Sequence, residues 1–132
     1  MSVDSIADFL TIIRNGVMVS KSFITAPYSK MRHSIAQILK NEGFIHDFAI
    51  INADSDAKRM LKIVLKYVDG ESVIHEIQRV SKPGRRVYAG SQKIKPVIGQ
   101  LGISILTTSR GVIASQKAEQ LSVGGEVICT VW

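Results

Sequence analysis

The stretch that decides the fold is ILTTSRGVIAS, residues Ile105 to Ser115. Two apolar segments typical of β-strands are joined here by three hydroxyl side chains, a guanidinium and a glycine. These joining residues are Thr107, Thr108, Ser109, Arg110 and Gly111. Asn-Gly or Asp-Gly ordinarily makes a tight hairpin turn, so this composition points to a role beyond turning the chain. We predict a β-hairpin with strands over Gly102 to Thr107 and Gly111 to Ala114.

Downstream of this hairpin, the sequence predicts a short helix and a last strand. The helix runs from Ser115 to Leu121, with Ser115 placed to cap it. A glycine pair then leads into the strand EVICTVW, whose Val127, Cys129 and Val131 are expected to share one face.

Upstream of the hairpin, short β segments are punctuated by turn signals. SVIHEIQRV, residues 72–80, is typical of a strand. Lys82-Pro83-Gly84-Arg85 has proline and glycine at the two central positions of a type II turn, which would reverse the chain into RVYA. Residues 91–102, SQKIKPVIGQLG, predict a loop with at most one helical turn.

The first half of the chain carries the helical signal. Ile6, Phe9, Leu10, Ile13 and Val17 recur at the spacing of an amphipathic helix. The predicted elements are a helix over Asp4 to Val19, a strand over Ser22 to Ala26, a helix capped by Ser29 and ended by Gly43, and strands over Phe44 to Ile51 and Arg59 to Val68.

Together these elements predict an α+β fold of two small lobes. An N-terminal α+β domain, residues 1–70, has the order helix-strand-helix-strand-strand, and a mainly β C-terminal domain with a short helix covers residues 71–132. The Asp69-Gly70 turn signal marks the boundary. A chain of 132 residues can bury a core in such an arrangement.

The charge distribution points to a polyanionic partner. The net charge is +6 and the isoelectric point is near 9.7, values that make nucleic acid a serious hypothesis. Between Glu76 and Glu119 there is no acidic side chain. The basic residues in that window are Arg79, Lys82, Arg85, Arg86, Lys93, Lys95, Arg110 and Lys117.

Composition argues against several other classes of protein. No apolar run reaches the roughly 18 residues of a membrane span, and Asp4 and Asp8 do not fit a secretory leader. The single cysteine, Cys129, cannot form an internal disulfide. We expect a cytoplasmic protein with no membrane partner.

The sequence offers no catalytic or metal-binding pattern. Cys129 lies among alternating apolar residues, and His33, His46 and His75 lack the spacing of metal ligands. The chain contains no G-x-x-x-x-G-K-[ST] and no G-x-G-x-x-G. We therefore predict no enzyme activity, no cofactor, no metal and no small-molecule substrate.

The residues of the hairpin tip fit RNA binding better than they fit catalysis or metal binding. The shallow groove of A-form RNA displays 2′-hydroxyls and base edges that short hydroxyl side chains can reach. Thr107, Thr108 and Ser109 could supply those contacts, but they could instead form a turn that bonds its own backbone. A second candidate group consists of Arg85, Arg86 and Tyr88. These residues could contact phosphate and stack on a base, or they could simply lie on a solvated edge strand.

Several motifs in fixed order resemble one family. SKPGRRVY, LGISILTTSRGVIAS and VGGEVICTVW, with DSIADFLTIIRNG and SKMRHSIAQILKNEGFI before them, make the chain similar to the bacterial small-subunit ribosomal protein number eight. The resemblance implies a structural protein of the ribosome, a primary binder of an irregular helix in the central domain of small-subunit ribosomal RNA that helps this domain assemble. Its implied partners are that RNA and neighbouring small-subunit ribosomal proteins.

The resemblance also implies binding residues. The main RNA contacts fall on the hydroxyl-rich loop, Thr107 to Gly111, and on Gly124, Gly125 and Glu126. We expect the Glu126 carboxylate to accept hydrogen bonds from the loop and orient it. The implied N-terminal contacts are Thr11, Arg14, Asn15, Ser29 and Lys30. The alternative function is a general single-stranded RNA-binding module in which the basic window matters and the hydroxyls do not.

Overall fold

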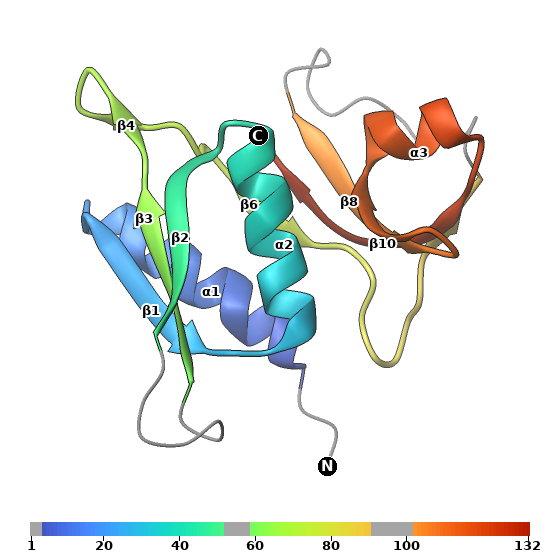
Figure 1. The fold of residues 1–132 in the computed structure, drawn as a ribbon, viewed down its shortest axis with the longest axis horizontal. Coiled ribbons are helices and arrows are strands. Elements are labelled where there is room, and N and C mark those ends of the chain that lie inside the picture. The colour runs from blue at the N-terminus through green and yellow to red at the C-terminus, as the bar shows by residue number, and fades with distance from the viewer. Residues whose placement is uncertain (1–3, 52–58, 91–101) are drawn as a thin grey trace. The chain divides into compact units, whose positions relative to one another are not determined.

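The computed structural model describes residues 4–51, 59–90 and 102–132. Across these ranges the chain forms three helices and ten strands, which confirms the predicted α+β class (Figure 1). The chain divides into two compact units, one of Ile6–Ile74 and one of Met1–Ser5 with His75–Trp132. Predicted features at residues 52–58 and 91–101, including Lys93, Lys95 and most of the predicted loop, lie outside the described residues.

The N-terminal unit combines two helices with a three-stranded antiparallel sheet of order β1-β3-β2. A two-stranded hairpin, β4-β5, follows this sheet. In chain order the elements are α1 (Ser5–Met18), β1 (Phe23–Pro27), α2 (Lys30–Asn41), β2 (Ile45–Ile51), β3 (Met60–Leu65), β4 (Tyr67–Val68) and β5 (Glu71–Ser72).

Helix α1 forms because its apolar side chains repeat on one stripe that the unit buries. Phe9, Leu10 and Ile13 are at most 1% exposed, and each such burial stabilises the fold by about 2 kcal/mol. Gly16 completes the stripe, since a Cβ atom there would collide with the Ile24 side chain of β1. The glycine therefore lets α1 lie close against the strand.

Helix α2 begins where the sequence predicts. The Ser29 hydroxyl accepts a hydrogen bond from the Arg32 backbone N–H at 3.1 Å, so the predicted N-cap is confirmed. The Arg32 guanidinium donates to the Pro27 carbonyl at 3.0 Å and lies 5.4 Å from the centre of the Phe9 ring. Gly43, at φ +82°, follows the last turn in the left-handed conformation that favours glycine.

The long predicted strand over Arg59 to Val68 is divided into β3 and β4. Tyr67 and Val68 pair with β5 around a turn at Asp69 and Gly70, whose φ values are +52° and +81°. Two positive φ values in succession are those of the type I′ hairpin turn. The turn signal at Asp69-Gly70 is therefore confirmed, but it closes a local hairpin.

In its described residues, the C-terminal unit is an antiparallel sheet with one short helix. Its strand order is β6-β10-β8-β9, and β7 also pairs with β10. The elements are β6 (Ile77–Arg79), β7 (Tyr88–Ala89), β8 (Ile103–Thr108), β9 (Gly111–Ala114), α3 (Ser115–Leu121) and β10 (Gly125–Val131). The predicted β8-β9 hairpin is confirmed, with Thr108 still part of β8.

A β-bulge in β10 overturns the predicted alternation of its side chains. Val127 pairs with Leu106, whereas Cys129 pairs with the adjacent Ile105, so one extra residue lies between the two pairs. Because neighbouring residues of β8 point to opposite faces, Val127 lies on the face opposite Cys129. The predicted shared face of Val127 with Cys129 and Val131 is therefore wrong.

Two local predictions in this unit are wrong, and one of them fails because a distant backbone group competes. The N-cap of α3 is Ala114, and the Ser115 hydroxyl instead accepts a hydrogen bond from the Ser104 N–H at 3.2 Å. Lys82 and Arg85 do pair around a two-residue turn. Gly84 lacks the positive φ that a type II turn requires.

The predicted strand over residues 72–80 is shorter than expected. Only Ile77–Arg79 forms β6, which pairs with the end of β10. The N–H groups of His75 and Glu76 both donate to the Trp132 carbonyl, at 2.6 and 2.8 Å. The Trp132 carbonyl therefore accepts from both of the N–H groups that precede β6.

Candidate nucleic-acid interface

Strand register brings the C-terminal candidates together at one end of the sheet. Across β7, β10, β8 and β9, one row of paired residues is Tyr88, Glu126, Thr107 and Val112. The next row is Ala89, Gly125, Thr108 and Gly111. Adjacent strands lie about 4.8 Å apart, so residues far apart in the sequence become close neighbours here.

The hairpin tip divides its hydroxyls between two roles. The Thr108 hydroxyl donates to the Gly111 carbonyl at 2.9 Å and accepts from the Arg110 N–H at 3.0 Å, so it closes the turn. Gly111 has φ +99°, a conformation that favours glycine. Ser109 and Arg110 form the exposed turn itself. The self-bonded alternative therefore holds for Thr108, and Ser109 is the exposed hydroxyl at the tip.

Gly124 and Gly125 serve the packing of the sheet. A Cβ atom on Gly124 would lie 2.5 Å from the Ala89 carbonyl oxygen. One on Gly125 would collide with the Thr107 carbonyl oxygen. Neither neighbour is a flexible side chain, so both positions require glycine for the strands to approach.

The Glu126 carboxylate binds the segment that leads into β7. Its Oε2 accepts hydrogen bonds from the Ser81 hydroxyl at 2.5 Å and from Arg86 Nη1 at 3.0 Å. The hydrogen bond from Ser81, followed by that from Arg86, holds the pKa of Glu126 below its ordinary value, against the opposing effect of burial. The expectation that Glu126 orients the 107–111 loop is corrected, since these partners lie at residues 81 and 86.

Ser81 is the residue that the sequence analysis missed. Its side chain is fully buried, and its oxygen also accepts from the Val87 N–H at 3.1 Å. It thus connects the β10 carboxylate to the backbone next to Tyr88. The only sequence signal was its place before the Lys82-Pro83 turn, which does not reveal a contact made 45 residues away.

Exposed cations and an aromatic ring border the sheet end. Arg85 lies in an exposed turn, and Arg86 is anchored through Glu126. Tyr88 is 69% exposed although it belongs to the paired row. Tyr88 and Arg86 thus offer a ring face and a cation at the Glu126 row, which is next to the row that leads into the exposed Ser109-Arg110 turn.

The N-terminal candidates lie in the N-terminal unit. Thr11, Arg14 and Asn15 are exposed on α1, and Lys30 is exposed at the start of α2. The Ser29 hydroxyl accepts the capping hydrogen bond of α2, so its first role is structural.

The described residues contain no group of three or more histidine, cysteine or acidic side chains that could hold a metal ion. Burial raises the pKa of the Cys129 thiol to about 12, so it remains protonated at neutral pH. Within the same described ranges, no helix has the length and apolar character needed to cross a bilayer.

The fold and this site define an α+β protein with a cation-bordered, hydroxyl-bearing sheet end. A family model described as Ribosomal protein S8 matches residues 4–132, so the chain belongs to this family. The family is one of ribosomal proteins and is not enzymatic. The resemblance found in the sequence is confirmed.

Full-length relatives agree with the family match. A small ribosomal subunit protein uS8 from Marinobacter nauticus is 50% identical over 98% of this chain and 97% of its own length. Proteins of the same name from Paraburkholderia xenovorans and Rhodopirellula baltica are 52% and 46% identical. The matches cover 97% and 99% of this chain, and 96% and 99% of those proteins.

Proposed function

We propose that the chain is a structural constituent of the small ribosomal subunit that binds an irregular helix in the central domain of small-subunit ribosomal RNA. It acts there in the cytoplasm, with the RNA and neighbouring ribosomal proteins as partners and with no cofactor. Family membership and the full-length uS8 relatives support the ribosomal part. The geometry of the C-terminal sheet supports the RNA-binding part.

The observation that carries this proposal is the four-strand register at the sheet end. It aligns Tyr88, Glu126 and Thr107 in one row and places the exposed Ser109-Arg110 turn beside the next. A sheet held by backbone hydrogen bonds changes shape little on binding. The exposed groups are therefore organised before RNA arrives, which lowers the entropic cost of association.

Each exposed group has a chemical role at an A-form groove. The Ser109 hydroxyl can donate to or accept from a 2′-hydroxyl or a base edge. Arg85 and Arg110 attract phosphates, which gives affinity without selectivity. The Glu126 charge is offset by its ion pair with Arg86, so this carboxylate repels the RNA less than a free one would.

The exposed N-terminal candidates, Thr11, Arg14, Asn15 and Lys30, would add contacts from the N-terminal unit. Short polar side chains and cations are again the chemistry that suits a folded RNA. Ser29 contributes by fixing the start of α2, which carries Lys30.

A second candidate function, single-stranded RNA binding, is favoured by one observation. Tyr88 is 69% exposed and lies near Arg86, a combination on which an unpaired base can stack. In that case the hydroxyl tip would be irrelevant to affinity.

Competition binding separates the two functions. The purified chain is bound to a labelled irregular helix from the central domain of small-subunit ribosomal RNA, then challenged with poly-U and with a regular duplex at fixed salt. We expect both competitors to be at least about tenfold weaker than the helix. Equal competition by poly-U would support single-stranded binding and contradict the proposal.

A charge-matched pair of variants tests whether the RNA binds at the end of the C-terminal sheet. Arg110→Ala should weaken helix binding, because its cation lies at the tip. Lys117→Ala removes another exposed cation, from α3, and should leave binding within about twofold of wild type. Equal losses in the two variants would indicate attraction to overall charge instead of a site at the sheet end.

A further inference from the structure

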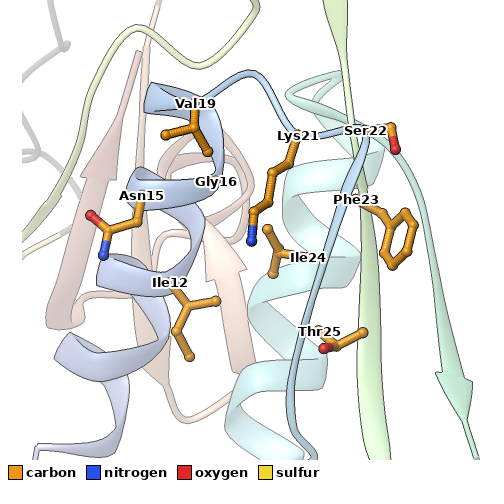
Figure 2. A pocket seen from close by; sticks show the side chains of 9 residues that line it. All are labelled: Ile12, Asn15, Gly16, Val19, Lys21, Ser22, Phe23, Ile24 and Thr25. Atoms are coloured by element: carbon orange, nitrogen blue, oxygen red, sulfur yellow. The ribbon is translucent and has the colours of Figure 1, made fainter.

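An open groove of about 920 Å³ lies between α1 and the start of β1 (Figure 2). Ile12, Asn15 and Val19 line it from the helix side, and Lys21, Phe23 and Thr25 from the strand side. Figure 2 shows the Lys21 side chain in the space between the two elements. All of these residues belong to the N-terminal unit.

The strand beside this groove is an edge strand. Within residues 4–51, 59–90 and 102–132, β1 pairs with β3 alone. Leu65 N–H donates to the Ser22 carbonyl, and Tyr28 N–H donates to the Arg59 carbonyl. In an antiparallel pair such bonds recur at every second residue. The backbone groups of Phe23 and Thr25 therefore point away from β3, toward the open edge.

A strand added to this edge would use the groove as well as the backbone. Side chains alternate between the two faces of a sheet, and Ile24 and Ala26 of β1 are buried on the helix side. Every second side chain of an added strand would therefore enter the space beside α1. Pro27 has no N–H to offer, so the usable edge is short and centred on Phe23 to Thr25.

The residues that line the groove include apolar side chains and one charged side chain, a lysine. Val19 lines the groove and is 66% exposed, and the adjacent Met18 is 75% exposed; neighbouring exposed apolar side chains are typical of a protein contact. Lys21 is the charged residue among those that line the groove. A complementary partner therefore carries apolar side chains and an acidic group.

We propose that the β1 edge binds an extended segment of another protein, by strand addition. The segment places alternate apolar side chains in the groove and an acidic side chain near Lys21. Backbone hydrogen bonds to Phe23 and Thr25 supply affinity, and the groove supplies specificity. This inference rests on the proposed function only for the expectation that the chain has protein neighbours in the ribosome. It adds the way in which one of those neighbours docks.

A peptide assay tests the inference without RNA. The probe is a fluorescein-labelled synthetic peptide of about ten residues, with valines at alternate positions and one central glutamate. Its controls carry lysine in place of the glutamate, or N-methyl groups on the two central residues. We expect the purified full chain to bind the first peptide, and each control to bind at least about fivefold more weakly.

Two exposed valines provide matched variants of the protein. Val19→Asp places a charge in the groove and should weaken peptide binding about tenfold. Val68→Asp changes a valine that is 56% exposed on β4, and should alter binding less than about twofold. Lys21→Glu should reverse the preference, so that the lysine peptide binds more tightly than the glutamate peptide.

Amide hydrogen exchange identifies the bound groups. The Phe23 and Thr25 amides should become protected when the glutamate peptide is present. No binding at about 1 mM peptide, equal loss in the two valine variants, or stronger protection of these amides by a 12-nucleotide poly-U would overturn the inference. A chain that binds the peptide but not the RNA helix would contradict only the proposed function, and the converse result only this inference.

Discussion

The end of the C-terminal sheet and the β1 edge of the N-terminal sheet differ in what they leave for a ligand. Strand β10 has neighbours on both sides, β8 on one and β6 with β7 on the other, so its backbone groups are used inside the sheet. Strand β1 has a neighbour on one side among the described residues, and its Phe23 and Thr25 backbone groups face outward. At β10 the first region offers a ligand its side chains, whereas at β1 the second region also offers its backbone.

This difference explains why the two regions suit different partners. Side chains at a rigid sheet end, such as Ser109, Arg110 and Arg85, match the dispersed phosphates and hydroxyls of a folded RNA. Unpaired backbone N–H and C=O groups match another strand. The glycines of the C-terminal region serve the sheet itself, which gives the largest of the effects predicted below.

Gly125→Ala should cost about 3 kcal/mol of unfolding free energy, because its methyl group would overlap the Thr107 carbonyl oxygen. Gly84→Ala is the matched control, since a Cβ atom there meets nothing within 4 Å and the backbone has no positive φ. It should change stability by less than about 0.5 kcal/mol. Urea unfolding measures both, and equal stabilities would refute the close packing of β8 and β10.

Ser109→Ala and Thr108→Val should separate binding from folding at adjacent residues. Ser109→Ala should cost about 1 to 3 kcal/mol of RNA-helix affinity and leave the melting temperature unchanged, because the exposed hydroxyl would lose its RNA partner. Thr108→Val should cost about 1 kcal/mol of stability, because it removes the turn-closing hydrogen bonds.

Fluorescence anisotropy and thermal unfolding of both variants test this division. Unfolding of Ser109→Ala would make its hydroxyl a structural device like that of Thr108. Unchanged RNA affinity in a folded Ser109→Ala would remove the tip from the proposed interface.

Features encoded within a few residues could be predicted from the sequence. The β8-β9 hairpin follows from two apolar segments around a polar turn. The Ser29 cap follows from a hydroxyl that lies three residues before the N–H group from which it accepts a hydrogen bond. The same reasoning failed at Ser115, whose hydroxyl accepts from an amide 11 residues away. Local rules thus succeed until a distant group competes for the same atom.

The roles of the residues in the candidate site depend on contacts between residues that lie far apart in the sequence. The residues of the sheet end could be named in advance, but their roles depend on register, which sequence periodicity does not set. The bulge between Val127 and Cys129 reverses the face of Val127 relative to the later residues of β10. Ser81 joins the site through Glu126, a contact that no spacing in the sequence indicates.

Arg85→Ala should produce a smaller change, spread evenly over RNA ligands. Its exposed guanidinium is expected to meet a phosphate, so the variant should bind the irregular helix and a regular duplex less tightly by about the same factor. The slope of log affinity against log salt concentration should fall by about 1. Titration from low to high salt checks this, and a loss confined to the irregular helix would instead make Arg85 a base-reading residue.

The smallest predicted effect concerns how the unfolding free energy changes at acidic pH. The pKa of Glu126 lies below its ordinary value of 4.5 in the folded chain, chiefly because of the Ser81 hydrogen bond. Its stabilising contribution is therefore complete above that ordinary value and is lost as the pH falls through the lowered pKa. Glu126→Gln should unfold more easily than wild type at neutral pH, and this difference should shrink below pH 4.5.

Asp47→Asn is the control for that experiment, because the Asp47 pKa is also lowered, first by a hydrogen bond from Lys40. That ion pair is exposed, with 45% and 54% of the two side chains accessible, so about 1 M salt should screen it. The Glu126 side chain is only 17% exposed and its main partner is a buried hydroxyl, which salt does not screen. Chemical unfolding in urea at high salt should therefore retain the Glu126→Gln effect and reduce the Asp47→Asn effect to what the unscreened hydrogen bond from the Phe48 N–H supplies. Equal reduction of both effects would mean that Arg86, and not Ser81, dominates at the sheet end.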